Sequence, residues 1–172
     1  MKIPFRLSLR SPARIDEQMR TLILVLGGSN QHAQLLPHTP PEGFVPAPRY
    51  CHWNSWQQMS LCGGAIQPGW MLFQDPVANM AEAIFHSVWV APNGQLQDVT
   101  PREDEEELVL FIPDPTRAIT LTEHGGRPAI YTYQNALVHG LKVVGQPERF
   151  LNVLVDGYTE SIGLWPWPGT EL

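Results

Sequence analysis

The pattern of apolar and polar positions over residues 50–101 predicts one helix followed by strands. The segment "CHWNSWQQMSLC", which begins at Cys51, suits a short helix that Gly63 and Gly64 bring to an end. The next segment, "AIQPGWMLFQD", predicts a strand with an irregularity at its Pro-Gly pair. "VANMAEAIFHSVWV" begins ambiguously and becomes a strand, and "QLQDVTP" is its expected hairpin partner.

The pattern is weaker outside this core motif. The run "TLILVLG" at residues 21–27 fits a buried strand or a short helix, and residues 28–50 are rich in Pro and Gly and predict a loop. An acidic run, interpreted as a solvated loop, leads into the apolar strand "LVLFIPDP". A C-terminal extension over residues 117–172 contains segments that fit strands or helices. It ends in "WPWPGTEL", which we expect to be irregular and packed by its two Trp.

The length, the net charge and the N-terminal residues exclude several classes of protein. The 172 residues suggest a single domain, residues 1–172, and the formal net charge of −6 argues against a general nucleic-acid binder. Three arginines interrupt the first 14 residues, which is unlike a signal peptide, and residues 21–28 are too few to span a membrane. We therefore expect a cytoplasmic protein without nucleic-acid or membrane partners, with Cys51 and Cys62 as thiols rather than a disulfide.

The turn between the two hairpin strands predicts their register. Residues 91–95, "APNGQ", suit a type I turn followed by a left-handed Gly, which forms a three-residue loop with a bulge. If Ala91 faces Gln95, then His86 and Asp98 lie on one face as diagonal neighbours, roughly 7 Å apart at the backbone. A two-residue Asn-Gly loop would shift the register and put them on opposite faces.

Three residues in this motif can form a nucleophilic site. Cys51 opens the predicted helix, where exposed amides stabilise a thiolate. His86 can exchange the proton of the thiol, and Asp98 can hold the imidazole in one orientation. Each residue also has a plain structural interpretation: a buried thiol, a satisfied core histidine, and a cap on the turn before Thr100. The three together, with the hairpin geometry, favour a catalytic triad.

A metal site is the weaker alternative for the same region. It would use Cys51, His52, Cys62 and His86, but this spacing matches no zinc pattern and most of the helix separates the two cysteines. We expect no metal and no other cofactor. His52 follows Cys51 and would point in another direction, towards the surface or a cleft wall.

Other residues are candidates for contact with a substrate. Asn54 and Ser55 lie one turn past Cys51, where they could meet a substrate or simply be surface polar residues. One or two tryptophans could wall a groove, although tryptophans fill cores by default; the candidates are Trp53, Trp56, Trp70 and Trp89. The amide of Cys51 is the natural oxyanion donor, since no upstream glutamine has the short spacing of papain-type proteases.

The order of helix Cys, strand His and next-strand Asp resembles the transglutaminase-like branch of papain-fold proteins. The segments "HSVWV" and "DVTP" correspond to its "HAWV" and "DPT" patterns. The same window, continuing to "LFIPDP", is similar to a set of bacterial proteins of which some carry a metal-binding SEC-C tail, which this chain lacks. The resemblance implies an α+β fold with a papain-like core, in which a Cys-bearing helix packs on an antiparallel sheet.

The resemblance also implies thioester chemistry on a carboxamide or peptide bond, carried by Cys51, His86 and Asp98. We expect a cysteine-dependent deamidase, amidase, peptidase or transferase whose substrate is a protein or peptide. The alternative is a non-catalytic binding or regulatory protein on the same fold, for which the apolar and aromatic C-terminal third would supply a partner surface. The sequence leaves the oligomeric state open.

Overall fold

The structure is mixed α/β, with mostly antiparallel sheets and few helices; it is a computed structural model that describes residues 8–28, 32–103 and 106–166. The order along the larger, seven-stranded sheet is β1 (Gln34–Pro37), β5 (Leu108–Pro113), β2 (Ala65–Asp75), β3 (Met80–Val90), β8 (Ala136–His139) and β9 (Lys142–Gly145), with β4 (Leu96–Gln97) paired to the end of β3. The smaller sheet contains β10 (Arg149–Val153), β7 (Arg127–Tyr133) and β6 (Thr120–His124). The helices of the described ranges are α1 (Glu17–Val25), α2 (Cys51–Cys62) and α3 (Tyr158–Ser161).

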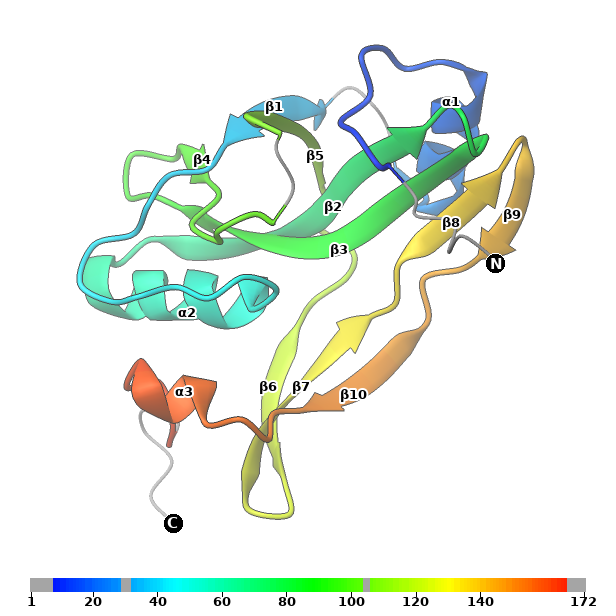
Figure 1. Ribbon diagram of the computed structural model, residues 1–172. Helices are drawn as coiled ribbons and strands as arrows, with labels where there is room; N and C mark the ends of the chain where they lie inside the picture. Colours follow the sequence, from blue (N-terminus) through cyan, green and yellow to red (C-terminus); the bar gives the residue numbers. More distant parts are fainter. Residues whose placement is uncertain (1–7, 29–31, 104–105, 167–172) are drawn as a thin grey trace, which may run out of the picture.

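Helix α2 lies between the two sheets (Figure 1). It packs against β3 of the larger sheet, while Trp53 joins a buried cluster of the C-terminal region that includes Ile130, Leu154 and Leu164. Strand β7 continues into β8, and β9 continues into β10, so this two-strand ribbon passes from one sheet to the other. The helix that begins at Cys51 is therefore held from two sides.

The β2–β3 hairpin is the longest pairing and sets what faces α2. Its ladder runs through eleven pairs, from Ala65 opposite Val90 to Asp75 opposite Met80. Alternate residues of a strand point to opposite faces. Phe85, Ser87 and Trp89 point towards α2, where His52 contacts Phe85 and Ser87, and Trp89 donates to the Gly63 carbonyl at 2.8 Å. Ile84, His86 and Val88 share the opposite face.

The hairpin register predicted from the Pro-Asn-Gly turn is confirmed. The Ala91 amide donates to the Gln95 carbonyl at 2.9 Å, and Gly94 has a φ of +85° that suits the bulge. Trp89 pairs with Gln97, which is the register in which His86 and Asp98 share a face. The shorter two-residue loop is therefore excluded.

The strand that follows the turn at residues 91–95 is shorter than expected. Strand β4 ends at Gln97, and Asp98 instead forms an isolated parallel bridge with His38. The Thr39 amide donates to the Asp98 carbonyl at 2.7 Å. The backbone of Asp98 therefore turns away from β3 while its side chain stays on the face of His86.

For residues 21–50, the pattern of apolar positions alone did not predict the secondary structure correctly. The ambiguous run at residues 21–27 is mostly helical, as the second part of α1, because Asp16 caps the helix by accepting from the Met19 amide at 2.9 Å. The expectation that residues 28–50 are entirely loop was wrong, because β1 pairs with β5 at the edge of the larger sheet.

None of the helices in the described part of the chain has the length and apolar character that crossing a bilayer requires.

The C-terminal third of the chain contains five strands and one short helix within the described residues. It supplies β6 to β10. Some of its apolar side chains complete the core around Trp53, while Leu141, Val144 and Val155 are exposed. Leu164 is 1% exposed in this cluster. The second Trp of the tail, Trp167, lies outside the described residues.

Replacing Gly69 with Ala should destabilise the protein by about 1–3 kcal/mol because it overpacks the core. Gly69 lies opposite His86, and a Cβ there would come within 2.4 Å of both the Phe111 ring and the Ile112 carbonyl. Chemical denaturation of G69A measures the loss. The control is Gly28→Ala, whose Cβ would meet its nearest atoms at ordinary contact distances of 3.8 Å or more. Equal stability of the two variants would contradict this packing.

Candidate active site

Cys51 occupies the first position of α2, where backbone amides are left without helical acceptors. The Asn54 amide donates to the Tyr50 carbonyl at 2.8 Å, which closes the first turn of the helix. Tyr50, the N-cap residue, offers no side-chain cap. The partial positive charge of these amides and of the helix dipole therefore lies beside the thiol, which is only 7% exposed.

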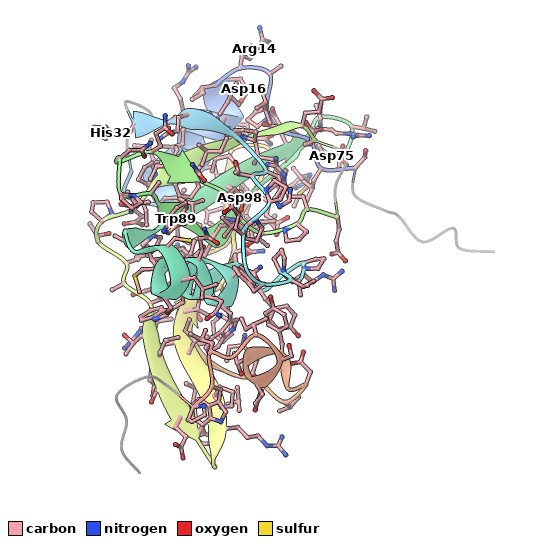
Figure 2. The ribbon with its side chains drawn as sticks, turned by 90° about the vertical axis from the view of Figure 1, so that its left-hand side faces the viewer. Arg14, Asp16, His32, Asp75, Trp89 and Asp98 are labelled. Atoms are coloured by element: carbon pink, nitrogen blue, oxygen red, sulfur yellow. The ribbon has the colours of Figure 1, made fainter. Side chains whose placement is uncertain are left out.

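His86 and Asp98 form a buried pair, in which His86 lies next to the Cys51 thiol. The Nε2 atom of His86 lies 2.9 Å from Oδ1 of Asp98, and the two residues are 6% and 0% exposed. Figure 2 shows Asp98 above α2, at the level of the larger sheet. The same Oδ1 accepts from the Thr100 amide at 3.1 Å, so Asp98 also makes the turn contact that its structural interpretation predicts. Within the described residues Oδ2 has no hydrogen-bond partner, which makes the carboxylate depend on these two bonds.

The charges of this group favour a thiolate beside an imidazolium. Burial by itself would raise the pKa of Cys51, but positive charge on His52 and His86 and hydrogen bonding to the His86 ring hold it well below its usual value. Burial opposes the charged form of His86, yet the Cys51 thiolate and the Asp98 carboxylate outweigh it and raise the pKa of His86 to about 10. Since Asp98 occupies Nε2, the ring has Nδ1 available for the thiol.

His52 was expected at the surface or in a cleft wall; it is buried next to the thiol and lines a cavity of about 320 Å³. Its Nδ1 lies 2.6 Å from the Ser87 hydroxyl and its Nε2 lies 2.9 Å from the Thr132 hydroxyl, and the residue is 8% exposed. These two bonds tie the start of α2 to β3 of one sheet and β7 of the other. The sequence held one sign of this contact. Ser87 follows His86 directly, so its side chain points to the opposite face of β3, where it can meet His52 of α2.

Cys51 and His86 both line a cavity of about 270 Å³, which gives a small molecule access to the thiol. Its other walls come from β2, β3 and the segments on either side of the triad, at Pro48 and at residues 100–103. A cavity of about 430 Å³ lies farther along α2, at Trp56 and Met59, and includes neither Cys51 nor His86. The smaller cavity is therefore the one that the three residues can use.

The proposed substrate residues lie in the core and not in this cavity. Asn54 is fully buried, donates to the Ala47 carbonyl at 2.9 Å and to the Thr100 hydroxyl at 3.1 Å, and accepts from the Tyr158 hydroxyl. Of the four candidate tryptophans, Trp53, Trp70 and Trp89 are each at most 7% exposed. The fourth, Trp56, is half-buried and lines the cavity of about 430 Å³. Trp53 and Trp70 each line a cavity that does not include Cys51. Large aromatic side chains on a helix or strand gain most from burial, and here that gain decides their position.

The alternative metal site does not form. Cys51 and Cys62 stand at opposite ends of α2, about 16 Å apart along the helix axis, so they cannot ligate one ion. Across the described ranges, no group of three or more His, Cys, Asp and Glu side chains could hold a metal ion.

Comparisons of the chain with protein-family models, with curated proteins and with solved structures found no match.

The pKa of His86 should depend on the neighbouring thiolate. In the wild-type protein we expect the His86 ring to keep its second proton until about pH 10. Cys51→Ala removes the anion that contributes most to this rise, so the transition should move to a lower pH. NMR of the imidazole nitrogens measures the titration, and Cys62→Ala, at the far end of α2, is the matched control. A transition near 6.5 in every variant would contradict this electrostatic arrangement.

Asn54→Ala should destabilise the protein by about 1–3 kcal/mol, since it leaves buried groups of Ala47, Thr100 and Tyr158 without their partner. Thermal or chemical unfolding measures the effect. Ser60→Ala on the same helix is the control, because its hydroxyl contacts only the Trp56 carbonyl at an exposed position. An Asn54→Ala variant as stable as Ser60→Ala would show that this residue does not hold the segments together.

Proposed function

We propose that the protein is a cysteine-dependent hydrolase or acyltransferase that acts on a carboxamide or peptide bond through Cys51, His86 and Asp98. The observation that carries this proposal is the 2.9 Å contact between Asp98 and Nε2 of His86, which orients the ring beside a thiol at a helix start. A carboxylate, an imidazole and a thiol in this order form the arrangement that activates sulfur nucleophiles.

The first half of the reaction makes a thioester. The Cys51 thiolate attacks the carbonyl carbon, a carbon–sulfur bond forms, and the carbonyl electrons move to the oxygen. The amide of Cys51, at the first position of α2, is the donor placed to stabilise this oxyanion. The carbon–nitrogen bond then breaks as the His86 imidazolium gives its proton to the leaving amine.

The second half releases the acyl group. Neutral His86 takes a proton from water, whose oxygen attacks the thioester carbon and expels the Cys51 thiolate. An acid leaves and the imidazolium is restored. If an amine attacks in place of water, the product is a new amide, which is acyl transfer. Asp98 stays ionised throughout and stabilises the positive ring.

His86 is a better acid–base group than His52, although both rings lie near the thiol. Asp98 supports a positive charge on His86, whereas both ring nitrogens of His52 are occupied by hydroxyl groups. We assign His52 the role of holding the start of α2. The order of helix-borne Cys51, His86 on β3 and Asp98 after β4 also supports the resemblance to the transglutaminase-like branch and to a papain-like core.

Cys51 should alkylate with an apparent pKa well below the free-thiol value of about 8.5, and His86→Ala should raise that pKa. The physical reason is the loss of the positive ring that stabilises the thiolate. The measurement is the rate of iodoacetamide labelling of each cysteine against pH, followed by peptide mass spectrometry. Exposed Cys62 is the reference thiol within the same chain.

The control for this measurement is Cys51→Ala, which should remove the fast-labelling site and leave the labelling of Cys62 as it was. If Cys51 titrates like Cys62 with or without His86, the enzymatic proposal fails. A non-catalytic binding protein would then be the better interpretation, since a binding surface has no need of a reactive thiolate.

A further inference from the structure

The floor of the cavity beside Cys51 is a continuous apolar surface that begins at His86. Ile84 lies two residues before His86 on β3, and Met71 pairs directly with Ile84 across the β2–β3 ladder. Phe73 lies two residues beyond Met71 on β2. Residues two apart on a strand, and residues paired across a ladder, share a face, so these side chains form one surface with His86. All of them line the cavity.

The charged groups at the rim of the cavity already have partners. Nε of Arg49 lies 2.6 Å from Oε2 of Glu103, which joins the two sides of the rim. Arg102 donates to the carbonyls of Leu36 and Glu107, at 3.3 Å and 3.0 Å. A charged substrate group at this rim would have to compete with these contacts and then enter an apolar space, where an unpaired charge is costly. An uncharged group meets neither obstacle.

The cavity also has a suitable size for one large side chain. A dry apolar cavity of about 150 Å³ is large enough to bind benzene, and this one measures about 270 Å³. Because Cys51 and His86 stand in its wall, an occupant lies directly beside the atoms that react.

We propose that this cavity binds an uncharged apolar group of the substrate, an aromatic or long aliphatic side chain, next to the bond that Cys51 attacks. This inference rests on the proposed thiol chemistry and adds to it a substrate class. Peptides or amides with a large apolar group beside the reacting carbonyl are favoured, and those with a charged group at the same place are disfavoured.

The test compares three alkylating reagents that share one reactive group: iodoacetamide, N-benzyl iodoacetamide and N-(2-carboxyethyl) iodoacetamide. For each reagent the rate at Cys51 is divided by the rate at exposed Cys62 in the same molecule, which cancels differences in intrinsic reactivity. We expect the benzyl group to raise this ratio at least tenfold over iodoacetamide, because burying a side chain of this size is favourable by about 1.5–3 kcal/mol. The carboxyethyl group should lower it.

A pair of variants shows whether the preference comes from the cavity floor. Ile84→Asn makes the floor polar without adding charge, and should reduce the benzyl preference at least fivefold. Leu137→Asn is the matched control, because Leu137 is also half-buried and lies on the neighbouring strand β8, opposite Glu82 and outside the cavity. It should keep the preference.

The outcomes separate the two proposals. If Cys51 labels fast with iodoacetamide at low pH but shows no benzyl preference, the apolar site is wrong and the thiol chemistry stands. A preference that Ile84→Asn leaves intact also overturns the site. If Cys51 labels like Cys62 with all three reagents, both proposals fail.

Discussion

The pairing of β2 with β3 is the constraint on which the rest of the structure depends. Its eleven pairs decide that Phe85, Ser87 and Trp89 face α2 while Ile84 and His86 face the cavity. A shift of one residue would exchange the two faces. The thiol of α2 would then meet Ser87 in place of His86, and the apolar floor would turn towards the helix. One ladder therefore sets both the packing of the helix and the chemistry beside it.

The start of α2 shows how a buried polar group is tolerated. A thiolate and an imidazolium are costly to remove from water, and the mutual attraction of such a pair does not always repay that cost. Here the dipole at the start of α2, the Asp98 carboxylate and two histidines offset it. The Ser87 and Thr132 hydroxyls fix His52 at both ring nitrogens, so the ring cannot turn away from its position. The residues around the thiol are thus hydrogen-bonded as well as charged.

Much of this site could be predicted from the sequence because its parts are local. The turn at residues 91–95 and the alternation along β3 are enough to pair His86 with Asp98, and Gly63 marks the end of α2. What the sequence did not show depends on contacts between distant segments. The bond from His52 to Thr132 joins residues 80 positions apart, and the core position of Asn54 depends on Tyr158, 104 positions away. No period or motif in the chain encodes such contacts.

Because a two-strand ribbon crosses from the smaller sheet to the larger one, the segment from Cys51 to Asp98 cannot be moved to another protein with all of its contacts. Transplanting it would carry the three side chains and the turn that pairs two of them. It would leave behind Thr132, which anchors His52, and the cluster around Ile130 and Leu164 that seats Trp53. The short motif holds the three residues of the proposed triad, but residues near the far end of the chain enclose them. Proteins that share only the motif therefore need not share the reactivity of its sulfur.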